Sequence, residues 1–421
     1  MNLIAADSIQ VTAQEKPASG VEQYLERISV DPVNALDACI PDIGYGPQRQ
    51  QLIGVVISGV SAAAGTPVNI HLAGDFAEGK TTVARAAADI VGPDFVVSSG
   101  SLQKMTAAAA ARMAENITGR CTMFDERCRG DHEFDSMLRM VSSGHAASRT
   151  ITMNGAPVEL TIRPPVAIVE AVLANKEIAP PDRSRYLRLR MSSHETTREQ
   201  ITLLNAQRYT LEGVDRKLRY DMFTRAFQLL LARLRRNLKV IVPFATDITL
   251  ETHSPIRDRL LSNVLNATCT VAWLRQEHRP RDHSASCGEY IIADVEDYEV
   301  IHSIVMACGE DGSDDVLPDN ALNLFRVWSG WVRVHGNRGI ARNAFDQIAN
   351  GQLRHWQVYR ALRCLADAGY AKGPTGRGTM GHWYLTDLGL ASDHPNLFGA
   401  LPTPEQLRAS RKAATLPDNT T

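Results

Sequence analysis

The stretch GDFAEGKT, residues 74–81, stands between a β-rich apolar run, Val68–Ala73, and an alanine-rich run with helical spacing, Thr81–Val91. It matches the pattern G-x-x-x-x-G-K-[ST], in which a glycine-bounded turn joins a strand to a helix and points backbone N–H groups inward. The helix N-terminus adds its partial positive charge to these groups. The sequence therefore predicts a phosphate-binding loop, with a glycine-rich turn carrying an exposed lysine as the alternative.

The loop predicts ATP and Mg²⁺ as cofactors. Lys80 is expected to reach the β- and γ-phosphates, and the Thr81 hydroxyl is expected to ligate the magnesium ion. The residues expected to contact the nucleotide are Gly74, Asp75, Phe76, Ala77, Glu78, Gly79, Lys80, Thr81 and Thr82.

A second strand ends in two adjacent carboxylates. The apolar run Cys121–Phe124 is followed by Asp125 and Glu126, and Asp125 comes 45 residues after Lys80, which leaves room for one strand and one helix. We expect Asp125 to hold the magnesium ion through water and Glu126 to orient and deprotonate the attacking water. Solvated acids at a strand end are the alternative.

Strands and helices alternate from Gln48 to Gly312, which predicts an α/β fold with a mainly parallel sheet. The runs with helical periodicity become longer after Thr197, and a linker-like stretch begins at Gly312. The expected division is an N-terminal segment, partly disordered (1–47), a P-loop ATPase core (48–196), a helical lid region (197–312), a winged-helix domain (319–392) and a flexible tail (403–421).

A hairpin is predicted around Asn154-Gly155, because this dipeptide lies between two β-rich runs and suits a two-residue turn with positive φ. The hairpin leads into another buried strand, Pro165–Ala171. Two arginines, Arg183 and Arg185, then precede an alternating strand.

This combination of loop, acid pair, hairpin and paired arginines resembles an AAA+-type ATPase, nearest to the hairpin-bearing helicase branch that includes MCM. Residues 240–298 are similar to the ATPase modules of primase-helicases on phages, plasmids and other mobile elements. The resemblance covers roughly residues 48–309 and implies a homo-oligomeric ring, expected to be a hexamer. It also implies that Arg183 or Arg185 is an arginine finger acting on the neighbouring subunit, and that the hairpin tip at Asn154 touches DNA.

The sequence departs from the family pattern at two points. The fourth core strand is expected to end near Glu170, where the family has a neutral polar sensor, and Asn175 follows it. The hairpin tip has no Lys or Arg, and Arg149 is its nearest cation.

The C-terminal unit reads as three helices and a glycine-rich hairpin, which resembles a winged helix. In that fold the third helix enters the major groove and holds duplex DNA. The candidate DNA contacts are Arg354, His355, Gln357, Arg360, Arg363 and, on the wing, Arg377. A winged helix used for protein contacts is the alternative. Three tryptophans, Trp328, Trp331 and Trp356, are expected to lie in the core.

The charge distribution is uneven, although the net charge is only −2. The windows 208–239 and 325–389 each hold nine Lys or Arg against three Asp or Glu, so each carries 9 − 3 = +6. Two basic surfaces fit a protein that binds DNA, whereas two solvated helical faces are the alternative.

The apolar runs and the cysteines indicate in which cellular environment the protein is expected. No apolar run reaches the ~18 residues of a membrane-spanning helix, and the longest candidate, Leu52–Gly65, is interrupted by Ser58, Gly59 and Ser61, so we expect a cytoplasmic protein without a membrane partner. Seven cysteines without a CxxC pair argue against a disulfide framework or a cysteine-rich zinc site.

The leading expectation is an ATP-dependent DNA helicase or translocase of a mobile genetic element. The rival is a DNA-binding ATPase switch, such as a loader or a transposition or defence regulator, without unwinding activity. A metabolic P-loop kinase is disfavoured because it leaves the basic windows unexplained. The chain has no primase-like acidic cluster, so any primase or replication partner is expected on another chain.

Overall fold

The structure is a computed structural model of the whole chain. The part that it describes comprises residues 20–75, 78–98, 107–124, 132–153, 156–173, 185–191, 195–248, 257–286, 288–310, 319–348, 354–367, 370–374, 381–386, 389–390 and 401–415.

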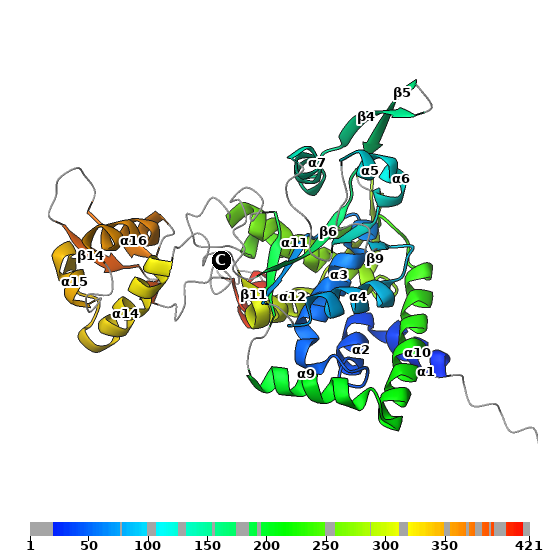
Figure 1. Cartoon of the computed structure of the whole chain (residues 1–421), viewed down its shortest axis with the longest axis horizontal. Coiled ribbons are helices and arrows are strands. Elements are labelled where there is room, and N and C mark those ends of the chain that lie inside the picture. Colours follow the sequence, from blue (N-terminus) through cyan, green and yellow to red (C-terminus); the bar gives the residue numbers. More distant parts are fainter. Residues whose placement is uncertain are drawn as a thin grey trace, which may run out of the picture.

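A six-stranded sheet forms the centre of the larger body (Figure 1). Its order is β11-β7-β1-β6-β3-β2, and only the edge strand β11 is antiparallel to its neighbour. Numbered as they occur along the chain, the parallel strands follow the order 5-1-4-3-2. Their bounds are β1 Ile70–Gly74, β2 Val96–Ser98, β3 Cys121–Phe124, β6 Ala167–Leu173 and β7 Leu187–Arg190, with β11 at Gly309–Glu310. The predicted α/β fold with a mainly parallel sheet is confirmed.

Helices cover both faces of this sheet. On one face lie α3 (Arg49–Ala64) and α4 (Lys80–Val91), which share a core with alternate residues of β1 and β6. On the other face lie three shorter helices, α5 Ala107–Arg112, α6 Ala114–Ile117 and α7 His132–Ser142. Because both faces are covered, the central strands read as apolar runs rather than as alternating ones.

The α3 helix is apolar on all sides, and nearly all of its residues are buried. One side packs on the sheet, and the other is covered by α11 (Arg257–Leu274) and α12 (Val295–Cys308). A helix without a polar face can only be stable in such a position.

Residues 197–312 differ from the predicted helical lid. They contain α9 (Glu195–Gln207), α10 (Leu211–Arg233), α11 and α12, but also a second sheet of order β8-β10-β9. The strands of that sheet are β8 Lys239–Ile241, β9 Arg281–Ser284 and β10 Gly288–Ile292. The helices α10, α11 and α12 contribute to the same core as α3, and α11 and α12 cover the outer side of α3.

The two ends of the described chain also pack on this body. Helices α1 (Gly20–Val30) and α2 (Pro32–Cys39) join the main core near α10 and α3. The prediction of a flexible tail over 403–421 is wrong for its first part, since α18 (Pro404–Thr415) lies against α12. Buried Leu407 and the ion pair from Arg408 to Glu299 hold it there.

Residues 319–390 form a separate small unit with its own hydrophobic core. It consists of α14 (Asp319–His335), β12 (Ile340–Ala341), α15 (Phe345–Ile348) and α16 (His355–Asp367), followed by an antiparallel pair. That pair is β13 Ala371–Lys372 with β14 His382–Leu385, and β12 joins it as a third strand.

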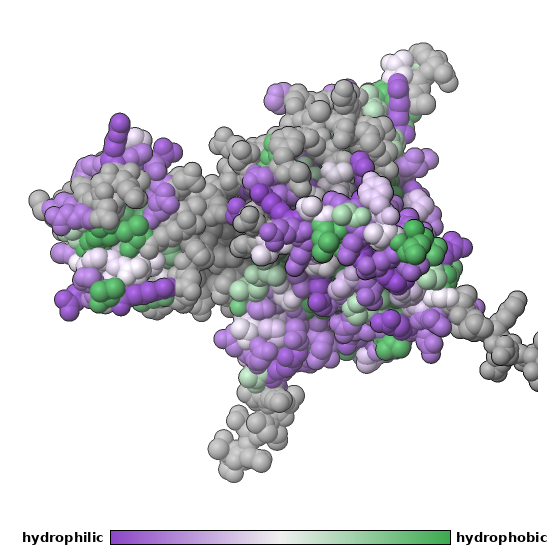
Figure 2. Space-filling model, turned by 60° about the horizontal axis from the view of Figure 1, so that its bottom comes forward, coloured by the Kyte–Doolittle hydropathy of each residue, from purple (hydrophilic) through white to green (hydrophobic). Residues whose placement is uncertain are grey.

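The face of the molecule drawn in Figure 2 is mostly polar outside its grey parts. In Figure 2, hydrophobic residues outside the grey parts form small, separate areas on a largely hydrophilic face. Among the described helices, none is both long and apolar enough to cross a bilayer.

Candidate functional site

The glycine-rich loop begins where β1 ends, at the carboxyl edge of the parallel sheet. Gly74 is the last residue of β1, paired in register with Leu173 of β6, and Gly79 caps the N-terminus of α4. Gly79 has φ of +86°, and a Cβ there would come within 2.5 Å of the Gln48 side-chain nitrogen. The positive φ therefore favours glycine here, and any larger residue would also have to displace the Gln48 side chain.

Lys80 folds back over the start of this loop. Its ammonium group donates to the carbonyl oxygens of Gly74, at 2.7 Å, and Asp75, at 2.6 Å. The side chain thus lies between the end of β1 and the start of α4, where the charge of a lysine and the partial positive charge of a helix N-terminus add together. This arrangement suits a bound anion.

Glu78 is folded inward and fills the inside of the loop. Only 4% of the residue is exposed, and its carboxylate accepts a hydrogen bond from the Asp75 N–H at 2.7 Å. The other carboxylate oxygen lies 3.4 Å from Arg198 on α9, and the Glu78 carbonyl accepts from Gln48. Gln48 and Arg198 were missed by sequence reasoning, and neither belongs to a motif that could have found them.

Of the remaining predicted nucleotide contacts, two lie in the described part of the chain and two lie outside it. Thr81 and Thr82 lie in the first turn of α4. Phe76 and Ala77 lie outside the described residues, and so do Asp125 and Glu126. The strand that precedes this acid pair, β3, runs parallel to β1 with β6 between them, and both end at the same edge.

A row of ionisable side chains crosses the sheet behind the loop. His71 of β1 stands in register with Glu170 of β6 and with Arg188 of β7, and all three residues are buried. The His71 Nε2 atom lies 3.5 Å from the Glu170 carboxylate, and its ring stacks on Tyr186 at 3.8 Å. In the sequence these three ionisable residues stand inside apolar runs, and that pattern is the signal that could have pointed to them.

The expectation that the fourth strand ends near Glu170 is wrong. β6 continues to Leu173, so Glu170 is an internal strand residue paired across the sheet rather than a residue at the carboxyl edge. Asn175, the alternative sensor, lies outside the described residues.

Arg185 lies at the opposite edge of the sheet from the glycine-rich loop. Its backbone carbonyl accepts from Asn69, just before β1, and its side chain donates to the Ser143 hydroxyl at 2.8 Å. The five steps from Asn69 to Gly74 span about 16 Å of extended chain. Arg185 and the loop of the same chain are therefore not brought together. Arg183 is not among the described residues.

The predicted hairpin is present. β4 (Ala147–Met153) and β5 (Ala156–Ile162) are antiparallel and pair along their whole length. Two residues of the chain connect the two strands. Asn154, the predicted tip contact, is outside the described part. Arg149 lies near the base of the hairpin and forms an ion pair of 2.7 Å with Glu133 of α7, so the structure does not bring it to the tip.

The predicted DNA contacts of the small unit gather at α16. Arg354 immediately precedes the helix, and His355, Arg360 and Arg363 are exposed along it. Gln357 is half-buried, and its side chain accepts from the Arg354 N–H at 2.8 Å, which caps the helix N-terminus. Arg377 falls outside the described residues.

The three tryptophans expected in the core differ in how far they are buried. Trp328 is fully buried against Phe345, whereas Trp331 is half-buried and stacks on His335. Trp356 is 58% exposed, so its prediction as a core residue is wrong. It lies on the side of α16 that faces away from the small unit's core.

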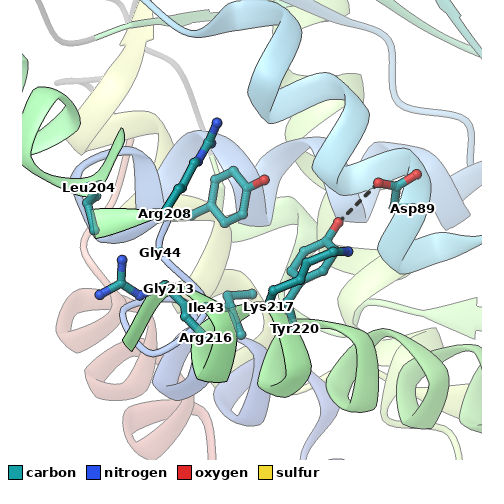
Figure 3. Close-up of a pocket in the computed structure, with 10 residues that line it drawn as sticks. Ile43, Gly44, Asp89, Leu204, Arg208, Gly213, Arg216, Lys217 and Tyr220 are labelled. Carbon is teal, nitrogen blue, oxygen red and sulfur yellow. Dashed lines mark hydrogen bonds between the residues drawn. The ribbon is translucent and has the colours of Figure 1, made fainter. Parts of the chain in front are cut away.

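A cavity of about 390 Å³ lies between α4, α10 and the segment before α3 (Figure 3). It is lined by Ile43, Gly44, Tyr45, Asp89, Leu204, Arg208, Gly213, Arg216, Lys217 and Tyr220. The Tyr220 hydroxyl donates to Asp89 at 3.3 Å, and Lys217 lies over the Tyr220 ring. Burial raises the pKa of Tyr45 and of Tyr220, so both phenols stay neutral at pH 7.

The cavity and the glycine-rich loop share two supporting segments. Tyr45 lies three residues before Gln48, which contacts the loop, and Leu204 lies on the same helix as Arg198, which pairs with Glu78. Segments that support the glycine-rich loop therefore also line a cavity with arginine, lysine and tyrosine side chains.

No metal-binding group of three His, Cys, Asp or Glu side chains occurs within the described ranges. Compared with known proteins, the chain matches no protein-family model and no curated protein.

Replacement of Glu78 tests the electrostatics of the loop. Glu78→Gln should keep the hydrogen bond from Asp75 and remove a negative charge beside the bound phosphates, so nucleotide affinity should rise by about tenfold. Glu78→Ala should lower affinity, because the loop loses its internal support. Titration calorimetry measures both, with the exposed Glu199→Gln as the matched control; equal affinities of wild type and Glu78→Gln would contradict the prediction.

Proposed function

We propose that this chain is an ATP-hydrolysing enzyme that acts on DNA, with a helicase or translocase as the leading form. The observation that carries the proposal is the glycine-rich loop at the carboxyl edge of the parallel sheet, with Lys80 at the start of α4. Ligands of open α/β sheets bind at this edge. A lysine and a helix N-terminus together favour a polyphosphate.

The surrounding residues fit ATP and magnesium. Thr81 in the first turn of α4 and Asp125, which follows β3 in the sequence, would hold the ion. When bound, the ion would offset the negative charge of the phosphates. The cavity beside Tyr45 and Tyr220 suits an aromatic base, since cavities of about 300–1,000 Å³ hold small ligands.

The location of Arg185 supports an oligomer. It lies at the edge of the sheet away from its own loop, so it could act on nucleotide only in a neighbouring copy. The α9–α10 connection also carries large exposed side chains, with Tyr209 at 94% and Leu211 at 85% exposure. A neighbouring copy in a ring would cover such residues.

A DNA-bound switch is the second candidate, and the hairpin favours it. Arg149 is the only Lys or Arg in the sequence from 147 to 162, and it is already paired with Glu133. A hairpin that offers no free cation along its described strands is a weak contact for a phosphate backbone.

DNA binding through α16 gives the first test. Arg360→Ala with Arg363→Ala should weaken binding to a forked duplex and reduce the slope of log K against log salt by about two, because each phosphate contact releases about one counterion. Fluorescence anisotropy at several salt concentrations measures this slope. Arg27→Ala with Arg112→Ala removes the same charge from the larger body and should leave the slope unchanged; an unchanged slope in both double variants would contradict the prediction.

Strand displacement separates the two candidates. A helicase should separate a forked duplex in the presence of ATP, whereas a switch should hydrolyse ATP with DNA and separate no fork of either polarity. Wild-type protein that behaves in the second way, at concentrations where mass photometry shows the assembled oligomer, would replace the helicase with the switch.

A further inference from the structure

Two parallel stripes of side chains run along α16. The buried stripe consists of Val358, Ala361, Leu362 and Leu365, which pack into the core of the small unit. The second stripe, Trp356, Tyr359, Arg360 and Arg363, has the same helical spacing on the solvent side. We call these four residues the outer stripe.

The outer stripe combines two aromatic rings with two guanidinium groups. Trp356 is 58% exposed and Tyr359 is 39% exposed. The guanidinium carbon of Arg342 lies 4.4 Å from the Tyr359 ring centroid, and that of Arg363 lies 5.6 Å from it. Within the described part of the chain, Trp356 makes no ring contact and no hydrogen bond, and more than half of the residue is accessible to a ligand.

The charge on this surface has one sign. No Asp or Glu occurs from residue 354 to residue 366, while Arg354, Arg360 and Arg363 are all exposed. The surface is therefore complementary to a polyanion, and a basic surface with interleaved aromatic rings is typical of proteins that bind single-stranded nucleic acid.

A closed duplex would use this surface poorly. Side chains that read base pairs in the major groove are mostly Arg, Lys, Asn and Gln, and a large ring finds no exposed base face there. Unpaired bases offer such faces, and each base stacked on an aromatic side chain adds about 1–3 kcal/mol.

We propose that the outer stripe of α16 binds unpaired bases of single-stranded DNA, with Trp356 as the stacking platform and Arg360 and Arg363 at the phosphates. The inference rests on the proposed DNA-directed function and narrows its substrate to DNA with a single-stranded region, such as a fork or a gap. It does not depend on ATP hydrolysis.

The test uses the full chain without nucleotide and three probes of equal length: oligothymidylate, the same strand with abasic sugars, and a blunt duplex. Wild type should bind oligothymidylate more tightly than either other probe. Trp356→Ala should weaken binding to oligothymidylate by about 5- to 100-fold. It should leave the abasic strand unchanged, whereas Trp356→Phe should retain much of the affinity.

Controls separate stacking from unfolding. Val30→Ala shortens an apolar side chain of the larger body that is 67% exposed, and it should change nothing. Because Trp356 is exposed, Trp356→Ala should also keep the wild-type melting temperature. Tryptophan fluorescence should fall when wild type binds oligothymidylate, and this quenching should be lost in Trp356→Phe.

Three results would overturn the inference. One is equal binding of the abasic strand and oligothymidylate by wild type, and another is unchanged binding of oligothymidylate by Trp356→Ala. The third is a change of oligomeric mass in Trp356→Ala with DNA binding intact, which would identify a protein contact. If the protein does not bind DNA at all, wild type should bind none of the three probes. If only the ATPase proposal fails, the binding results described above should remain.

Discussion

Glu126→Gln is expected to bind ATP like the wild type and to hydrolyse it about a thousand-fold more slowly. The substitution keeps the shape of the side chain but removes the carboxylate that would accept a proton from the attacking water, and a positioned general base contributes about 10²–10⁴-fold. Single-turnover hydrolysis beside calorimetric ATP binding measures the two effects separately.

Lys80→Ala complements Glu126→Gln, because it should already fail at ATP binding, the step before hydrolysis. The Lys80 ammonium lies against the carbonyls of Gly74 and Asp75, at the start of α4, and its loss removes the main positive charge of the loop. We expect no measurable ATP binding by this variant. Hydrolysis near the wild-type rate in Glu126→Gln would show that another group is the base, and ATP binding by Lys80→Ala would contradict the assignment of the loop.

Arg185→Ala is expected to bind ATP normally and to lose about a thousand-fold in turnover, the lower end of what an arginine finger supplies. The reason is geometric: Arg185 lies at the amino edge of the sheet beside Ser143, away from its own loop, so in the proposed ring it would act on the loop of a neighbouring copy. Steady-state ATPase rates at ring-forming concentrations measure the loss.

Mixing variants tests whether this effect crosses a subunit boundary. Lys80→Ala subunits retain Arg185, so they should restore part of the activity of Arg185→Ala subunits at mixed interfaces. Ser143→Ala removes the hydrogen bond to Arg185 but not its charge and should cost far less than Arg185→Ala. Absence of rescue at every mixing ratio would make Arg185 a structural residue of its own subunit.

The local elements of this protein could be predicted from short stretches of sequence. The strand, glycine turn and helix over residues 68–91 follow from an apolar run, a position that requires positive φ and a helical repeat. The hairpin follows in the same way from two β-rich runs around Asn154-Gly155, and its register has the expected two-residue connection. Each of these signals lies within a few residues of the structure that it specifies.

The supports of the candidate site could not be predicted in this way. Glu78 meets Gln48, 30 residues earlier, and Arg198, 120 residues later. His71, Glu170 and Arg188 become neighbours only because β1 lies between β6 and β7 in the sheet. Strand order brings these side chains together, and no local pattern encodes it.

The sequence by itself determined the strand, loop and helix over residues 68–91, the hairpin around Asn154-Gly155 and the parallel α/β class of the larger body. Only the tertiary structure decided that α18 covers α12, that Glu78 fills its own loop and that Trp356 of α16 faces solvent. The physical reason is that apolar burial has no direction. Periodicity shows that a face must be covered, but the partner that covers it is chosen by the packing of the whole chain.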